Sequence, residues 1–456
     1  MNNYGRKLNY ADGMPETKQG FPGKGIQQVF WIALFSVFYL LRDLAGVALP
    51  DIVFTGICAV AFFMTDVGTS LGIFIFTSAL TIPHIEIRFV YAIIMVTKLM
   101  FSGKLKMQPG MLLLTLGMLL LQLVDVLLFS ADSVYADIYD YGVKMLVLIL
   151  PLFWYGAEFS AQDFRRALLC YVAGVILGGT VILLITADHV SWSVLIAGTR
   201  GVRLGATENL TDTMQTAYNP NQLAGMFAIA VAIAVVFMEQ KWMPKLLALP
   251  LMGYALFIIV LTRSRTGVVL VGLTVLIYYW VLVFRKKKFW TGLGVLLAVV
   301  LLALAAFSIF PDATQALLHR FTDEEDITNG RADLFVLYLN AWSEDPWCFF
   351  FGYGIGTYSD VVDIWNVPHN VVTDILISWG LVGLFLTIAV LVMQYRKGIA
   401  LVEKKLLVLA SMPAAIALIA TIGGQYLTSG FPHMRLCFLL LAAKALAIPE
   451  KNGEKG

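Results

Sequence analysis

The chain has 456 residues, of which 59% are hydrophobic and only 14% are charged, and its mean hydropathy is +0.81. Water-soluble domains carry about 25% charged residues, so this composition excludes a soluble protein and indicates a polytopic membrane protein. The net charge of +2 is too small to favour nucleic acid as a partner.

Apolar stretches run through almost the whole chain. A transmembrane helix needs about 20 largely apolar residues, so the sequence predicts an all-α membrane protein with about 12 to 14 transmembrane helices. The candidate spans are 26–41, 44–63, 67–82, 87–101, 107–130, 142–157, 166–187, 220–239, 245–262, 266–284, 289–310, 371–394, 404–422 and 433–448. Pro50 and Asp51 leave open a different break within residues 26–63.

Polar segments divide these spans into regions. The first of them lacks the apolar core and the cleavage site of a signal peptide, so we expect a cytoplasmic tail there. The predicted regions are, in chain order, a tail at 1–25, transmembrane helices at 26–310 with an outer loop at 188–219, a large outer loop at 311–370, transmembrane helices at 371–448 and a second cytoplasmic tail at 449–456.

Lysine and arginine are distributed unevenly between the two sides of this arrangement. With both termini in the cytoplasm, most of them fall on the cytoplasmic side, including the run RKKK at 285–288. The large loop then lies outside. The outer side is rich in arginine, whose planar fork of donors fits phosphate and carboxylate groups. The alternative for each outer arginine is an ion pair with a nearby acid, such as Asp43 or Glu86.

The large loop contains one amphipathic helix. Its predicted face has helical spacing and consists of Arg331, Leu334, Phe335, Tyr338, Leu339 and Trp342. Thr328 or Asn329 is expected to cap its start, and Pro346 follows its end. We expect the helix to lie on the membrane surface with its aromatic side chains dipping in. Arg331 then either snorkels to the interface or, aided by the positive helix N-terminus, binds an anion.

The end of the large loop carries a histidine. Glycines 352, 354 and 356 indicate a tight turn, and Asn370 is expected to cap the helix that begins at 371, which leaves His369 at its outer mouth. A single histidine there is more often an interfacial residue than a catalyst. The histidines of the chain show no metal-ligand spacing, so no metal is expected.

Two further motifs are predicted on the same side. The segment TRSRTG at 262–267 joins two spans and places Arg263 and Arg265 at the membrane boundary, where buried cations tend to be functional. In the other outer loop, Arg200 and Arg203 precede NPNQLAG at 219–225. Asn219 begins a helix there and Asn221 follows it; a simple capped helix entry is the alternative interpretation.

The order of these motifs, from NPNQLAG through SRTG to the large loop with GR, GYGIGTY, PHN and GLVG, resembles the O-antigen ligase and O-antigen polymerase superfamily between Arg200 and Gly383. The resemblance implies a glycosyltransferase on the outer face of the bacterial inner membrane. Its donor would be a glycan on undecaprenyl diphosphate, and its acceptor another lipid-linked glycan or the lipid A core. It also implies membrane lipid around the protein, a flippase and a chain-length regulator as partners, and no cofactor.

The family's functional residues match Arg265 in the short turn, Arg331 in the large loop and His369 at its end. Arginines stabilise the charge that a diphosphate leaving group gains, and a histidine can take the proton of the acceptor hydroxyl. Arg263, Arg203 and Arg200 are expected to assist in diphosphate binding, and Asn219, Asn221 and Asn370 to support the site. One in-line attack would invert the anomeric centre. The acidic run 323–326 is a rival source of the base.

Two other classes of function compete with this prediction. A secondary transporter or a flippase requires polar residues near the middle of several spans. Gln122 and Asp125 lie near the outer end of one candidate span, but most of the other spans are free of such residues. A non-catalytic assembly protein would tolerate the loss of His369.

Overall fold

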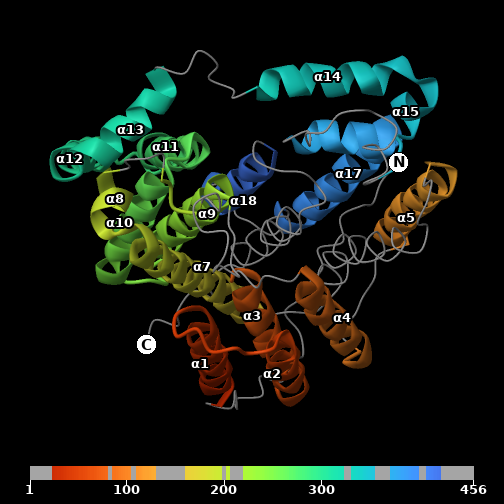
Figure 1. The fold of residues 1–456 in the computed structure, drawn as a ribbon, viewed down its shortest axis with the longest axis horizontal. Helices are drawn as coiled ribbons and strands as arrows, with labels where there is room; N and C mark the ends of the chain where they lie inside the picture. The colour runs from red at the N-terminus through yellow and green to blue at the C-terminus, as the bar shows by residue number, and fades with distance from the viewer. Residues whose placement is uncertain are drawn as a thin grey trace, which may run out of the picture.

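The computed structural model describes residues 23–80, 85–103, 109–129, 160–197, 202–205, 219–322, 330–354, 370–399 and 407–422. All regular elements in these ranges are helices, with no strand (Figure 1). The all-α fold predicted from composition is therefore confirmed.

The helices follow the apolar stretches of the sequence. They are α1 (Gly23–Asp43), α2 (Asp51–Met64), α3 (Val67–Ser78), α4 (Ile85–Phe101), α5 (Pro109–Phe129), α7 (Ala161–Val190), α8 (Trp192–Ala197), α9 (Pro220–Glu239), α10 (Lys245–Thr262), α11 (Arg265–Trp280) continued by the π-helical turn Val281–Arg285, α12 (Phe289–Ile309), α13 (Pro311–Thr322), α14 (Arg331–Glu344), α15 (Pro346–Phe350), α17 (Val371–Ile399) and α18 (Leu407–Ile422).

Seven helices within the described ranges are long and apolar enough to cross a membrane, and four shorter apolar helices accompany them. This confirms a polytopic membrane protein. The candidate spans 142–157 and 433–448 lie outside the described residues, so the total of about 12 to 14 helices stays a prediction.

Helix α9 forms the centre of the bundle. It packs against α7, α10, α11 and α18, and all of its residues from Leu223 to Phe237 are buried. Its many alanines allow this closeness, because small side chains let helices approach. Helix α12, in contrast, exposes its leucines and valines over most of its length. A hydrocarbon surround suits such a surface.

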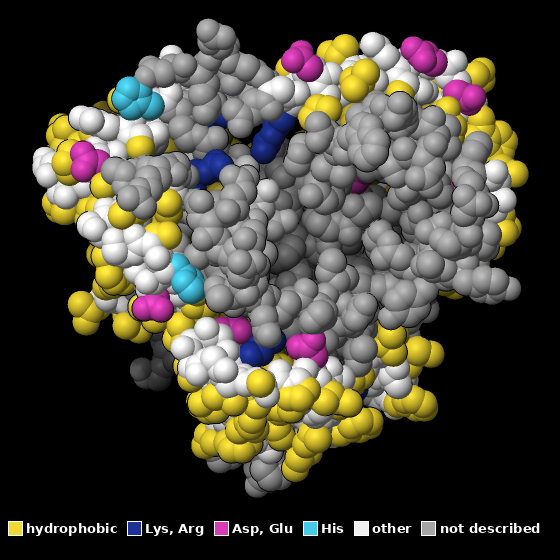
Figure 2. All heavy atoms as spheres, in the orientation of Figure 1, with side chains coloured by type: hydrophobic (Ala, Val, Ile, Leu, Met, Phe, Trp, Pro, Cys, Tyr) yellow, Lys and Arg dark blue, Asp and Glu magenta, His cyan; other side chains and the backbone are white. Residues whose placement is uncertain are grey.

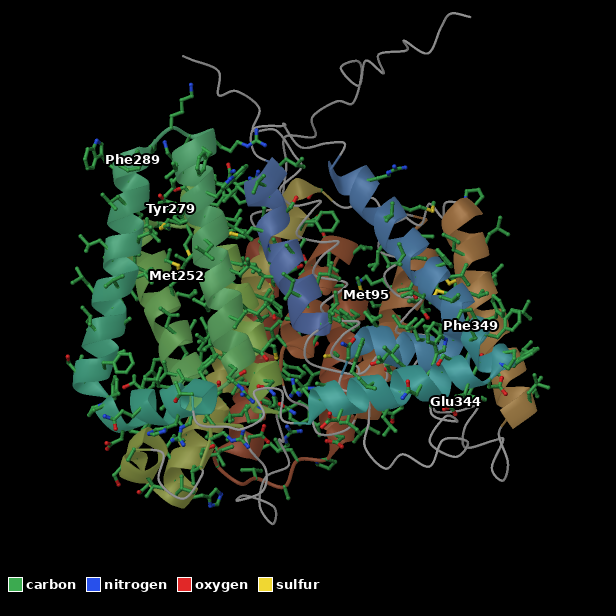
Figure 3. All side chains as sticks on the ribbon, turned by 90° about the horizontal axis from the view of Figure 1, so that it is seen from above. Met95, Met252, Tyr279, Phe289, Glu344 and Phe349 are labelled. Carbon is green, nitrogen blue, oxygen red and sulfur yellow. The ribbon has the colours of Figure 1, made fainter. Side chains whose placement is uncertain are left out.

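Contacts between helix ends show which segments lie at each of the two ends of the bundle. At one end Arg165 lies 3.6 Å above the ring of Trp242, and Lys286 pairs with Glu239. At the other, which carries α13 to α15 and is called the loop end below, Leu204 N donates to Leu261 O over 3.0 Å. Figure 3 shows Phe289 and Glu344 at opposite ends. That the loop end faces outward stays a prediction.

Two predicted spans are divided differently in the structure. The predicted span 44–63 begins only at Asp51, after Pro50, so α2 has 14 residues. Pro50 itself is extended, and a proline disfavours the helical conformation in the residue before it. The predicted span 371–394 is broken at Gly380, where φ is 61° and ψ is −162°. Only glycine adopts such a backbone readily.

Candidate functional site

The two short sequence motifs 219–225 and 262–267 form one joint at the loop end. Asn219 caps α9 by accepting a hydrogen bond from Asn221 N at 2.9 Å. The Ser264 hydroxyl caps α11 by accepting from Gly267 N at 3.2 Å and donates to Asn221 Oδ1 at 2.7 Å. Gly267 lies against Ala224 so closely that a Cβ atom would collide. The N-termini of α9 and α11 are thus fixed to each other.

Arginines surround this joint. Arg263 ends α10 in the left-handed conformation, with φ 49° and ψ 34°, and only 4% of it is exposed. Arg265 is the first residue of α11 and is half-buried. Arg203 is half-buried in the short segment 202–205, which the bond from Leu204 to Leu261 ties to the end of α10. Arg200 lies outside the described residues.

Arg331 comes to the same place from a distant part of the chain. It is the first residue of α14 and is half-buried. Burial and, second, the positive charge of Arg265 lower the pKa of Arg331 below its usual range. The second cause indicates that the two guanidinium groups lie within electrostatic range of each other. Figure 2 shows lysine and arginine side chains gathered in a hollow beside the beginning of α14.

The predicted face of α14 is confirmed, but what it covers differs from the prediction. Its members are buried or half-buried, while Val336 and Leu337 are more than 40% exposed. Tyr338 is buried against Ile377 of α17, Cys348 and Tyr353. The face therefore packs on protein and not on the membrane surface, because α17 offers an apolar surface there. Gly330 directly precedes Arg331 and makes no side-chain cap, and the predicted caps Thr328 and Asn329 lie outside the described residues.

Helices α14 and α17 run in the same direction. Tyr338 meets Ile377, and the backbone of Phe350, beyond the end of α14, meets Gly380, farther along α17. Arg331 precedes Tyr338 by seven residues, and Asn370 precedes Ile377 by seven. Both intervals correspond to about 10 Å of helix. The N-termini with Arg331 and Asn370 therefore lie at the same level, and their dipoles favour an anion there.

Asn370 begins α17 as predicted, because its side chain accepts a hydrogen bond from Val372 N at 2.9 Å. His369 directly precedes this cap and lies outside the described residues. Its role as base is therefore still a prediction.

The glycine-rich turn anchors the large loop in the break of α17. Tyr353 N donates to Ile377 O at 2.9 Å, and Gly354 N donates to Ser378 O at 2.8 Å. A Cβ atom on Gly352 would meet the backbone of Ser378, so only glycine fits. Carbonyl groups that the break at Gly380 deprives of helical partners thus gain new ones. The predicted tight turn is confirmed for the described residues 352 and 354.

Sequence reasoning missed Asp374 as a site residue. It is fully buried in the first turn of α17, one turn after Asn370. An acid in an otherwise apolar run was the available signal. Asp125, noted in the sequence, is also fully buried, and Gln122 beside it accepts a hydrogen bond from Trp379 at 2.5 Å. Helix α5 thus packs against α17 through polar as well as apolar contacts.

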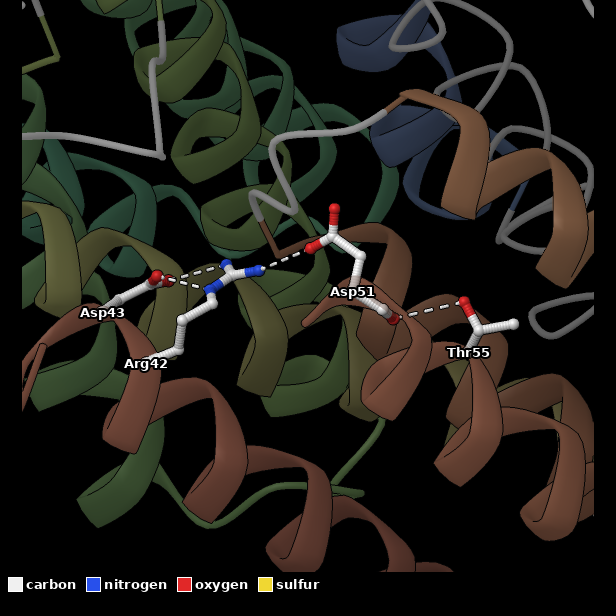
Figure 4. Close-up of polar contacts among 4 residues, drawn as sticks. All are labelled: Arg42, Asp43, Asp51 and Thr55. Atoms are coloured by element: carbon white, nitrogen blue, oxygen red, sulfur yellow. Dashed lines mark hydrogen bonds and ion pairs between the residues drawn. The ribbon is translucent and has the colours of Figure 1, made fainter. Parts of the chain in front are cut away.

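Arg42, an arginine that the sequence predicts on the outer side, follows the alternative interpretation. Arg42 donates two hydrogen bonds to Asp43, at 2.7 and 3.0 Å, and lies 3.7 Å from Asp51 (Figure 4). Its guanidinium also stands over the ring of Phe54 at 4.7 Å. The paired donors of Arg42 are thus used within the protein, and its role is structural.

The site combines cations and helix N-termini of suitable chemistry for a phosphorylated ligand. Within the described ranges, no group of three His, Cys, Asp or Glu side chains is placed to hold a metal ion.

Comparison with known proteins gives two matches. Residues 250–388 match the family described as O-antigen ligase, a stretch that includes Arg263, Arg265, Arg331 and His369. The O-antigen polymerase of Salmonella muenchen is 25% identical over 199 residues, which is 42% of this chain and 46% of that protein. The match thus spans less than half of the relative. No solved structure matches. The two matches support the resemblance to the O-antigen ligase and polymerase superfamily.

Proposed function

Because residues 250–388 carry the sequence of the O-antigen ligase family, we propose that this protein is a glycosyltransferase of the bacterial inner membrane. It transfers a glycan from undecaprenyl diphosphate to an acceptor hydroxyl on the outer face of the membrane. The similarity to an O-antigen polymerase favours growth of a polysaccharide from lipid-linked repeat units over ligation to the lipid A core.

The observation that carries the proposal is the meeting of Arg265 and Arg331. Burial and, second, the positive charge of Arg265 lower the pKa of Arg331. A diphosphate between them would reverse this effect, since its negative charges stabilise both guanidinium groups. Each guanidinium can offer two parallel donors to phosphate oxygens.

The supporting arginines differ in their burial and in how the fold holds them. Arg263 is buried beside the joint and Arg203 is held near the end of α10. In the proposed reaction they and Arg200 bind the outer phosphate oxygens. The cap bonds of Asn219 and Asn221, and that of Asn370, hold the backbone on which the ligating and reacting groups are mounted.

The proposed chemistry is a single displacement. The acceptor oxygen attacks the anomeric carbon and forms the new glycosidic bond. The bond from that carbon to the diphosphate oxygen breaks, and undecaprenyl diphosphate leaves with the electron pair. His369 takes the proton of the acceptor hydroxyl. Arg265 and Arg331 stabilise the charge that grows on the leaving group. Attack opposite the leaving group inverts the anomeric centre, and the step requires no metal.

Complementation of a deletion strain tests the proposal. Wild-type protein should restore the ladder of surface glycan lengths, whereas Arg265→Ala, Arg331→Ala and His369→Ala should restore none at equal membrane abundance. Gln315→Ala, an exposed change on α13, is the matched control and should restore the ladder. A full ladder from the arginine and histidine variants would refute a catalytic role and favour a transporter or an assembly protein.

Purified protein then separates the acceptors. Incubation with one synthetic lipid-linked repeat unit should yield products of two and more units, and a chelator should leave the yield unchanged. Transfer only after addition of lipid A core would show a ligase. Analysis of the new linkage by nuclear magnetic resonance would show whether the anomeric centre is inverted.

A further inference from the structure

Asp374 is an unusual residue for its place. It is fully buried in a helix whose other first-turn side chains are Val371, Val372 and Thr373. A buried carboxylate costs free energy unless polar groups surround it. Such a residue at the head of the helix that follows His369 therefore calls for a functional explanation.

Helical spacing directs Asp374 toward α14. It precedes Ile377 by three residues and follows Asn370 by four, so the three share one face of α17. Ile377 on that face packs against Tyr338 of α14. Asp374 thus lies in the interface between the helix that carries Arg331 and the helix that Asn370 begins.

Tyr338 is the partner that the geometry offers. Its ring is buried in the middle of the α14 face, two turns after Arg331. Burial and, second, the negative charge of Asp374 raise the pKa of Tyr338 to about 12. A tyrosine phenol is protonated at neutral pH and can donate toward a carboxylate.

We propose that Asp374 is a positioning residue which, through Tyr338, holds α14 in register with α17 so that Arg331 meets the donor diphosphate. The inference rests on the proposed function for the role of Arg331. The hydrogen bonds from Tyr353 and Gly354 fix the chain beyond the end of α14 to α17. Asp374 lies one turn before Ile377 and, facing Tyr338, would extend this register toward Arg331.

The test measures binding of undecaprenyl diphosphate to the full-length protein in detergent. Asp374→Asn and Tyr338→Phe should each weaken binding about 5- to 20-fold, and the double variant should be no weaker than the poorer single one, since both changes remove one interaction. Tyr353→Phe, in the same buried cluster but outside α14, is the matched control and should bind as the wild type does.

The outcomes distinguish the two proposals. Misfolding lowers the fraction of protein that binds but not the affinity of the rest, so affinity and the unfolding midpoint are measured together. If Asp374→Asn does not fold, the test uses Tyr338→Phe, which removes only the phenol oxygen. Wild-type affinity in Tyr338→Phe, or losses that multiply in the double variant, would overturn the inference. Retained binding in Arg331→Ala would instead refute the proposed function.

Discussion

Two arginine sites of this protein use the same side chain in different ways. Arg42 sits between Asp43 and Asp51 and over an aromatic ring, so its charge is balanced within the fold. Arg265 and Arg331 come from separate segments, and the charge of one disfavours the charge of the other. The first arrangement stabilises the folded chain without a ligand. The second brings two like charges under each other's influence, and in the proposed function a bound diphosphate stabilises both.

The largest expected difference concerns Arg42. Arg42→Ala leaves Asp43 buried without its partner, which costs about 3 to 5 kcal/mol of stability for buried pairs. We expect a large fall in the thermal unfolding midpoint in detergent, with normal activity per folded molecule. Arg42→Lys keeps the charge and should lose less. A variant that stays fully stable yet loses transfer would place Arg42 in the site.

The arginines of the site should show the opposite pattern. Arg265→Ala and Arg331→Ala are expected to lower kcat about 10²- to 10³-fold, as the loss of one donor to a developing charge does. Their unfolding midpoints should fall less than that of Arg42→Ala, because each change also removes a like-charge repulsion. Lysine at either position keeps the charge but not the fork, and should recover only part of the activity. An activity loss that merely tracks lost stability would contradict this.

A single substitution at Arg263 should change stability and transfer activity in different directions. A non-glycine residue in the left-handed region costs about 1 kcal/mol or more. Arg263→Gly should therefore keep or raise the unfolding midpoint while transfer falls. Lys241, with φ 57° at the opposite end of the bundle, provides the matched control. Lys241→Gly should gain similar stability without loss of transfer, and equal activity in the two variants would remove Arg263 from the site.

The smallest effect is expected at the joint between α9 and α11. Ser264→Ala removes the cap of α11 and the bond to Asn221, and loss of a cap costs about 1 kcal/mol. Because Ser264 lies between Arg263 and Arg265, we expect a raised KM for the donor as well. Asn219→Ala removes the cap of α9 alone. It should lower stability with less change in KM, and an equal rise in both variants would argue against a specific role of Ser264.

The sequence predicted where helices begin and end better than it predicted which parts of the protein they pack against. Spans 220–239 and 245–262 match α9 and α10 to the residue, because Asn219, Pro220 and Pro244 act locally at their ends. The face of α14 was predicted from spacing alone. What it covers was not, since packing on α17 depends on residues far along the chain. The break at Gly380 was missed because hydropathy does not change across it.

The same limit applies to the site. Arg263, Arg265 and Arg331 were identified from residue type, motif order and the predicted side of the membrane. The pairing of Arg42 with Asp43 was open until the structure placed both. Asp374 was overlooked because a single acid in an apolar helix indicates no partner, and Tyr338, whose pKa burial and Asp374 raise, lies 36 positions earlier. Proximity between distant segments is information that a linear pattern lacks.

The docking of residues 349–354 into the break at Gly380 bears on how related proteins can be recombined. The large loop ends by sequence at the cap Asn370, and a chimera would naturally be cut there. Yet hydrogen bonds and the close backbone contacts at Gly352 continue to Ser378 and Gly380. The smallest portable unit therefore extends from 330 to 380. A loop that is transplanted without the first half of α17 would lose the backbone contacts at Ser378 and Gly380 that hold it.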